Sequence, residues 1–284
     1  MSTIFQIHQE CPAKEDVLAF MTGQEEIESM ARQVRNIAKE FPDRPRLEVM
    51  ALYAAKPIEQ QQLVFKKTGE NCRKVVLATN IAETSVTIPG VRHVIDSCRV
   101  KAKLHQAGAG LDLMKVVKVS KAQAKQRTGR AGRESEGTCY RLVTAAEFEK
   151  LEEATVPEIQ RSNLASVVLT MLNIGIENIN AFDFMDAPGS EDINSAIRQL
   201  KLLGAVTEDN KLSDLGRKMA GFPLDPKLTA TILAGAELGC GEEILSIVSL
   251  VSGENVFNQP VNRERQEEAS QAHKVCQYKL SLSI

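Results

Sequence analysis

Short apolar runs alternate with amphipathic segments over the first half of the chain. Segments 24–41 and 58–65 have the residue spacing of helices. Short strands separated by such helices predict an α/β fold with a parallel sheet covered on both faces. In such sheets, ligands bind at the carboxyl ends of the strands. The expected strands are IFQIHQE (4–10), which alternates with a period of two, VLAFMT (17–22), LEVMALY (47–53), RKVVLATN (73–80), VRHVIDS (91–97) and GTCYRLVT (137–144).

The pattern changes near Val156. Segments 163–176 and 190–204 carry apolar residues at helical spacing, and Gly204 is expected to end the second helix. A two-strand element, AVT–EDN–KLS, and the helical DLGRKMAGFPL follow, so a mostly α winged-helix module is predicted. The helices expected over 225–252 indicate the start of a helical bundle. The predicted parts are therefore 1–155, 156–222 and 223–284.

Composition narrows the class of protein. The 284 residues are 43 % hydrophobic and 25 % charged, with a net charge of −2, so any affinity for nucleic acid has to come from a local patch. Six scattered cysteines form no CxxC pair, which favours reduced, mostly buried thiols over disulfides or a zinc site. The chain shows neither a signal peptide nor an apolar run long enough to span a membrane. We expect a reducing, intracellular compartment.

The stretch QRTGRAGR (126–133) concentrates positive charge beside two glycines. Ser120 is a candidate N-cap for a helix over KAQAKQRTGRAG. On such a helix Gln126, Arg130 and Arg133 fall within a wedge of about 60°. Each glycine would cost about 1 kcal/mol relative to alanine, which is reasonable where a ligand or another backbone approaches closely.

Two guanidinium groups and an amide on one side of a helix suit the γ-phosphate of a nucleotide. Guanidinium donors neutralise charge on the transferred phosphoryl group, and an amide can orient the attacking water. The alternative is an ordinary solvated basic helix end, which the flanking glycines make less favourable.

A second basic feature precedes this stretch. Between Arg99 and Arg133 there are ten basic residues against one acid, Asp112. RVKAKLH and LDLMKVVKVS flank the turn QAGAG and predict a β-hairpin. A basic hairpin on a nearly neutral protein indicates nucleic-acid binding, and an ordinary solvated hairpin is the alternative. The candidate contacts are Lys101, Lys103, Lys115 and Lys118.

These segments together resemble a known family. QRTGRAGR resembles motif VI of the DEAH-box branch of superfamily 2 helicases, FMTGQEEIE (20–28) is similar to its motif IV, and LATNIAETSVTIPG (77–90) to its motif V. FDFMDAP (182–188) and GRKMAGFPLDP resemble its winged-helix region and the passage into its helical bundle. The resemblance implies a second RecA-like domain with a basic hairpin near 100–119, then a winged helix and the start of a ratchet-like bundle.

The resemblance also implies an ATP site. Gln126, Arg130 and Arg133 match the family's catalytic positions at the γ-phosphate. Pro89 stands where the family often has an acid, so a carboxylate bond to the ribose hydroxyls is lost or replaced. Mg²⁺ would be held by a first RecA-like domain that this sequence does not contain. Phe65, Ser85 and Thr87 match positions that bind the rest of the nucleotide. For Phe65 the alternative is a place in the hydrophobic core.

The implied partner is RNA, held mainly by its single-stranded backbone. Gly23, Thr79 and Asn80 match positions that touch RNA phosphates without reading bases. Ile81 and Ala82 are apolar, so NIAETS could equally be a helix cap with core residues, and both roles stay open. The hairpin resembles the family's strand-separating or RNA-gripping element. Protein activators are possible partners, and no membrane contact is implied. A location in the nucleus or nucleolus is favoured over the cytoplasm.

Two motifs of the family do not occur in the sequence. It contains neither GxxxxGK[ST] nor a DEAH box, which bind the β-phosphate and Mg²⁺. We therefore expect a fragment of a helicase, or an incomplete gene model, without ATPase activity of its own. The alternatives are a non-enzymatic RNA-binding or regulatory module, and a DNA-directed helicase of the same superfamily.

Overall fold

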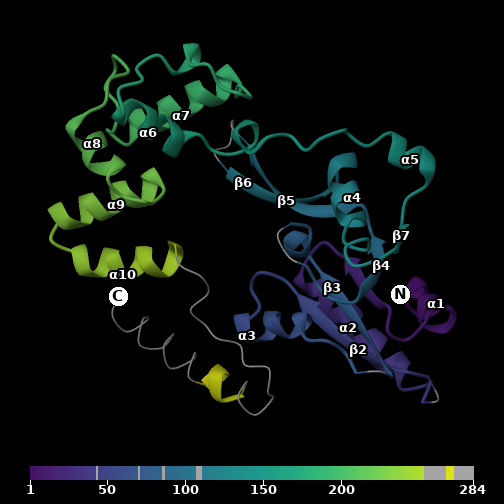
Figure 1. Ribbon diagram of the computed structural model, residues 1–284. Coiled ribbons are helices and arrows are strands. Elements are labelled where there is room, and N and C mark those ends of the chain that lie inside the picture. The colour runs from purple at the N-terminus through teal and green to yellow at the C-terminus, as the bar shows by residue number, and fades with distance from the viewer. Residues whose placement is uncertain (43, 70, 85–86, 107–110, 253–266, 272–284) are drawn as a thin grey trace. The chain divides into compact units, whose positions relative to one another are not determined.

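The computed structural model describes residues 1–42, 44–69, 71–84, 87–106, 111–252 and 267–271. The chain divides into two compact units, Met1–Ser162 and Asn163–Ile284, which we describe separately (Figure 1).

A parallel sheet forms the centre of the first unit. Its strand order is β2-β3-β1-β4-β7, and every neighbouring pair is parallel. The predicted α/β class is confirmed, and five of the six expected strands are present. They are β1 (Asp16–Phe20), β2 (Arg46–Leu52), β3 (Cys72–Ala78), β4 (Val91–Asp96) and β7 (Thr138–Arg141).

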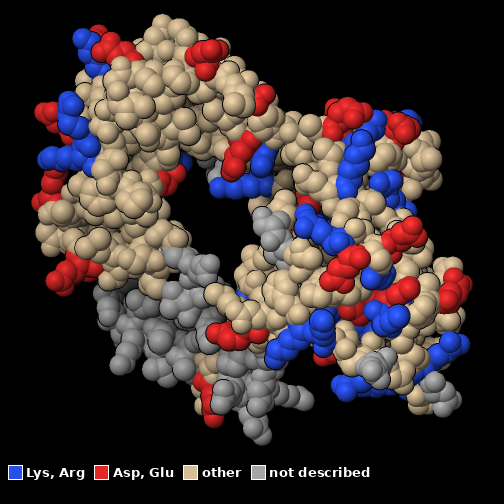
Figure 2. Space-filling view, viewed as in Figure 1, with Lys and Arg blue, Asp and Glu red and all other residues tan. Residues whose placement is uncertain are grey.

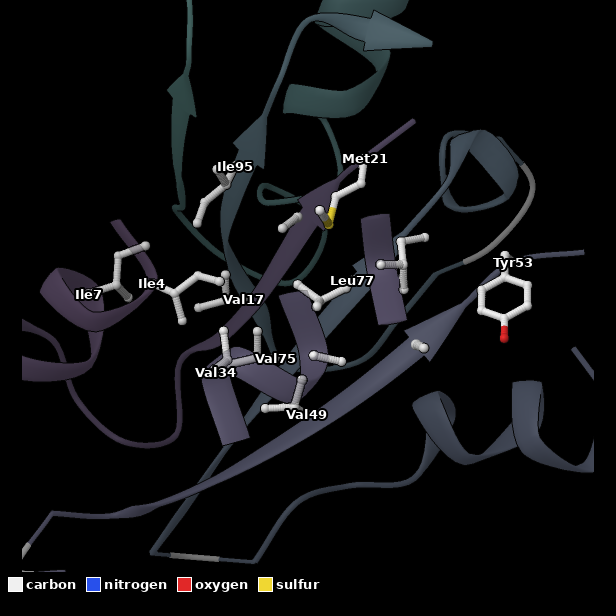
Figure 3. Close-up of a cluster of buried hydrophobic side chains, with 14 residues drawn as sticks. Ile4, Ile7, Val17, Met21, Val34, Val49, Tyr53, Val75, Leu77 and Ile95 are labelled. Carbon is white, nitrogen blue, oxygen red and sulfur yellow. The ribbon is translucent and has the colours of Figure 1, made fainter. Parts of the chain in front are cut away.

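Alternate residues of the central strands pack into two separate cores, because successive side chains of a strand point to opposite faces. Val17 of β1 and Leu77 of β3 face a cluster that α1 (Ser2–Glu10) and α2 (Gln24–Ala38) cover (Figure 3). Leu18 and Val76 face the other way. That second cluster is covered by η1 (Gln62–Phe65), which follows the short α3 (Ile58–Gln61), and by η2 (Asn80–Ala82).

The strand predicted over 4–10 is wrong, since these residues belong to helix α1. Ile4, Ile7 and His8 are its buried residues, and their spacing of three and four places them on one side of a helix. Seven residues fit both periods almost equally well. The helix is preferred here because it buries both isoleucines against the sheet.

A hairpin and a short helix follow β4. Strands β5 (Arg99–Gln106) and β6 (Leu111–Lys118) pair antiparallel, as predicted for this segment. Helix α4 (Lys121–Thr128) begins with a capping box in which the Ser120 side chain accepts the Gln123 N–H and the Gln123 side chain bonds back to Ser120. The helix ends at Thr128, earlier than predicted. Arg130 and Arg133 therefore lie in the turns after it and not on its surface. The unit closes with α5 (Ala145–Glu149) and η3 (Glu158–Gln160).

The second unit contains the predicted helix, helix, wing and helix. A single antiparallel bridge between Val206 and Leu212 forms the wing. Gly204 ends the second helix with φ of 71°, a left-handed conformation that glycine adopts without strain. In order the elements are α6 (Ala165–Asn173), η4 (Ile179–Ala181), α7 (Ser190–Leu202), α8 (Asp214–Ala220), α9 (Pro226–Glu237) and α10 (Gly241–Ser252).

Within the described residues, none of the helices has the length and apolar character needed to cross a bilayer. The five cysteines that the structure describes are free. Only Cys98 is buried and the other four are half-buried, so the expectation of mostly buried thiols is wrong.

Candidate nucleotide and nucleic-acid site

Three of the predicted RNA-contacting residues lie at the carboxyl edge of neighbouring strands. Strands β1 and β3 pair up to Phe20 and Ala78, where the chain leaves the sheet. Gly23 then forms the N-cap of α2, while Thr79 and Asn80 form the start of η2. Asn80 is exposed and Thr79 is half-buried. Backbone N–H groups at helix starts and short polar side chains can hold phosphates at such an edge.

Lys101 of the hairpin reaches this edge. A Cβ placed on Gly23 would lie 4.0 Å from the Lys101 Cδ. The structure thus brings the hairpin and the motif IV segment together, although they are far apart in the sequence. A cation stands beside the candidate phosphate contacts.

The four candidate lysines of the hairpin are exposed but do not share one face. Lys101 and Lys103 are two residues apart on β5 and therefore point to the same side. Lys118 lies on that side too, because it pairs directly with Arg99. Lys115 points to the opposite side. A single strand of RNA along one face of the hairpin would therefore meet three of the four lysines.

The positive charge of segment 99–133 is smaller at the surface than its sequence indicates. Arg127 is fully buried. Lys121 pairs with the exposed carboxylates of Glu149 and Glu153, at 3.4 and 2.7 Å. Figure 2 shows Lys and Arg side chains interspersed with Asp and Glu on the first unit. The exposed positive charge of the segment is thus concentrated mainly on the hairpin.

Two arginines and a threonine of the candidate nucleotide site come together. Arg130, Arg133 and Thr87 line a shallow depression with Leu18, Ile88 and Val91. The Arg133 Nη1 donates a hydrogen bond to the Thr87 Oγ1 at 3.2 Å. Motif V and motif VI are therefore joined by a direct contact at this depression.

The electrostatics of this pair suit an anion. Burial lowers the pKa of the Arg130 guanidinium, and the positive charge of Arg133 lowers it further, while Glu83 opposes the shift. A guanidinium group whose charge is disfavoured by a neighbouring cation gains from a polyanion beside it. The residues present therefore fit a phosphate group.

The other candidate residues are placed differently. Gln126 is exposed on the last turn of α4 and is not among the residues that line the depression. Phe65 ends η1 with 41 % of its surface exposed, so it is not a core residue and its ring is accessible to a base. Ser85 lies outside the described residues. The roles of all these side chains remain predictions.

Arg127 is an important residue that the sequence pattern did not identify. Its Nε donates to the Glu83 carboxylate at 3.0 Å and its Nη1 to the Asp96 carboxylate at 2.7 Å. The same Nη1 reaches the Arg99 carbonyl at 3.2 Å, and the guanidinium lies 4.8 Å from the centre of the Phe20 ring. One side chain thus connects α4 to the segment between Asn80 and Thr87, to the end of β4 and to the start of the hairpin.

A signal for this network exists in the sequence. Asp96 ends the otherwise apolar VRHVID, and Glu83 follows apolar Ile81 and Ala82. An acid in a buried strand requires a partner, because an unpaired buried charge is too costly. Ala82 is buried and Asn80 is exposed, so the NIAETS segment combines core residues with an accessible polar side chain.

One group of potential metal ligands occurs among the described residues. The ligand atoms of Cys11, Glu15 and His93 all lie within 4.8 Å of one another. His93 and Glu15 already form a hydrogen bond of 2.9 Å. The buried guanidinium of Arg73 carries positive charge close to Cys11 and Glu15, which disfavours a cation there.

Comparisons with known proteins agree with this geometry. The chain matches the helicase conserved C-terminal domain over residues 2–135. It matches the winged-helix and ratchet-like parts of the helicase associated domain (HA2) over 196–224 and 225–281. The crystal structure of the E. coli DExH-box NTPase HrpB superposes with a TM-score of 0.79 at 27 % identity, covering 96 % of this chain and 34 % of that one.

Curated relatives are more similar in sequence. The mouse ATP-dependent RNA helicase DHX33 is 51 % identical over 92 % of this chain and 38 % of its own length. The Arabidopsis thaliana pre-mRNA-splicing factor ATP-dependent RNA helicase DEAH10 is 45 % identical over 94 % of this chain and 37 % of its own length. The chain thus spans less than two fifths of the length of these relatives.

The parallel sheet, the joined motifs and the domain matches define a helicase C-terminal domain followed by the two helicase-associated domains. The chain is homologous to the C-terminal region of these DEAH-box RNA helicases.

The Arg127 network gives a prediction about stability. Arg127→Met would leave the buried carboxylates of Glu83 and Asp96 without a counter-ion, so we expect the first unit to lose about 3–5 kcal/mol of unfolding free energy. Urea denaturation of residues 1–284 measures this.

Lys121→Met is the matched control, because Lys121 also pairs with two carboxylates but these are exposed. Its loss of stability should be much smaller. Equal losses for the two variants would show that the buried network does not hold the unit together.

Proposed function

We propose that this chain is the C-terminal half of the motor of an ATP-dependent RNA helicase. The observation that carries the proposal is the pairing of Arg130 and Arg133 in one depression with Thr87. The relatives named above are ATP-dependent RNA helicases, which supports the same reaction here.

In this proposal Arg130 and Arg133 donate hydrogen bonds to the γ-phosphate and neutralise the charge that develops during its transfer. Phe65 stacks on the adenine, and Thr87 lies on the ribose side. Gln126 would have to turn from its exposed position to orient the attacking water. ATP supplies the phosphoanhydride bond that is cleaved. Binding of its β-phosphate and of Mg²⁺ needs a P-loop, and residues 1–284 do not contain one.

The proposed RNA contacts are sequence-independent. Gly23, Thr79 and Asn80 offer backbone N–H groups and small polar side chains at the edge of the sheet, and Lys101 supplies charge beside them. Such contacts fix the position of the phosphate backbone without reading bases. We place the protein in a reducing compartment, with nucleus or nucleolus favoured over cytoplasm.

The arginine pair gives a prediction about catalysis. In the native polypeptide that contains this chain, Arg130→Ala should lower the kcat of RNA-stimulated ATP hydrolysis about 10³-fold or more, the range measured for arginine fingers. A phosphate-release assay measures it. Lys125→Ala, an exposed cation on the preceding helical turn, should leave kcat unchanged.

The missing P-loop gives a second prediction. Residues 1–284 alone should release no phosphate from ATP above background, with or without single-stranded RNA, because the arginines act on a nucleotide placed by another domain. If the native polypeptide is also inactive yet binds RNA, the non-enzymatic alternative is correct and the motor proposal fails.

The two faces of the hairpin give a prediction about RNA binding. Lys101→Ala and Lys118→Ala together should weaken binding of single-stranded RNA more than Lys115→Ala. They should also reduce the slope of log K against log salt by about 0.7 for each phosphate that the protein no longer neutralises. Fluorescence anisotropy over a salt series measures both.

Lys39→Ala, an exposed cation at the end of α2 away from Gly23, controls for general charge effects. Equal weakening by all three sets of substitutions would contradict a one-sided RNA contact. Stronger binding of DNA than of RNA of the same sequence would favour the DNA-directed alternative.

A further inference from the structure

Lys74, a lysine of the central strand β3, is buried completely and has no contact with solvent. Its Nζ donates to three backbone carbonyls, those of Val64 at 3.0 Å, Lys66 at 3.0 Å and Pro89 at 3.1 Å. An ammonium group has three protons, so all its donors are used.

The three carbonyls come from two segments that carry candidate nucleotide contacts. Val64 and Lys66 stand on either side of Phe65, whose ring is 41 % exposed. Pro89 follows Thr87 by two residues, and Thr87 lines the depression with Arg130 and Arg133. The single ammonium group therefore fixes the separation between the Phe65 segment and the Thr87 segment.

Asp16 fixes the lysine in turn. Its carboxylate lies 3.5 Å from the Lys74 Nζ, accepts the backbone N–H of Lys74 at 2.8 Å and accepts the Thr68 hydroxyl at 3.3 Å. Gly90 packs directly on this carboxylate, since a Cβ at residue 90 would lie 2.5 Å from the Asp16 Oδ2, and its φ is +83°. The turn after Thr87 is therefore seated on the same buried pair.

Stability alone does not account for such a pair. Removing two charges from water is costly, and apolar side chains of similar volume often serve as well or better in a protein interior. A buried ammonium group does what an apolar side chain cannot, because it holds carbonyls of separate loops at one point.

We propose that Lys74 is a positioning residue of the nucleotide site. Its ammonium group holds the adenine-side Phe65 segment and the ribose-side Thr87 segment at the separation that a nucleoside triphosphate requires. The inference rests on the proposed ATP-driven function and deepens it. Lys74 itself does not touch the nucleotide, so its effect is on the binding of the nucleoside and not on the cleavage of the phosphate bond.

The test compares Lys74→Met with Arg73→Met in the native polypeptide that contains this chain. Arg73 is the neighbouring residue of the same strand and is also fully buried. Its guanidinium donates to the carbonyls of Cys11 and Pro12, which belong to the turn after α1 and not to a nucleotide segment. Arg73→Met therefore controls for the loss of a buried cation.

We expect Lys74→Met to raise the KM for ATP about tenfold or more, the effect of removing a well-placed stacking interaction with the base, with kcat within about threefold of wild type. Inorganic tripolyphosphate, measured as a competitor of ATP, carries no base or ribose, so its Ki should stay within about twofold. Arg73→Met should lower the melting temperature without moving the KM.

If Lys74→Met does not fold, Lys74→Met with Asp16→Asn is measured in its place, since it removes both charges of the pair. A rise in the KM for ATP alone supports the proposal. Parallel rises in the KM for ATP and the Ki for tripolyphosphate, the same KM for the Lys74 and Arg73 variants, or an unchanged KM would each overturn it. Wild-type protein that neither binds nor hydrolyses ATP would overturn the proposed function itself, and this inference with it.

Discussion

A guanidinium group enclosed between two carboxylates is the interaction on which the arrangement of this domain's motifs depends. Arg127 belongs to motif VI, yet it contacts Glu83 of motif V, Asp96 at the end of β4 and the first carbonyl of the hairpin. Each of these segments leads to a candidate contact with nucleotide or RNA. Because the charges are buried, moving Arg127 away from Glu83 or Asp96 would leave a buried carboxylate unpaired, at a cost of several kcal/mol. The motifs are therefore coupled mechanically before any ligand binds.

Much of the fold could be predicted from the sequence. Five apolar runs specified a parallel sheet, since strands buried on both faces are apolar at almost every position. The segments RVKAKLH and LDLMKVVKVS specified the two strands of the hairpin, which pair as predicted. The prediction for segment 4–10 was wrong because seven residues cannot distinguish a period of 2.0 from one of 3.6. Packing against the sheet determines that the segment is a helix. The end of α4 was predicted too late because Gly129 permits both continuation and termination of a helix.

The candidate site was predictable from the sequence only in part. Thr87, Arg130 and Arg133 were identified by motif and meet in the structure. Lys74 and Arg127 were not, because a basic residue in a sequence gives no sign of its burial until its acidic partners are located. Gln126 was placed beside the arginines by extending a helix that in fact ends two residues later. The exposed positive charge of segment 99–133 was overestimated because Arg127 is buried and Lys121 pairs with two carboxylates.

The closeness of the Lys101 stem to Gly23 has a consequence for target choice in the proposed function. A surface that contacts only sugar and phosphate would bind single-stranded RNA of any sequence with similar affinity. In the proposed function, selection among transcripts would then depend on features other than these backbone contacts.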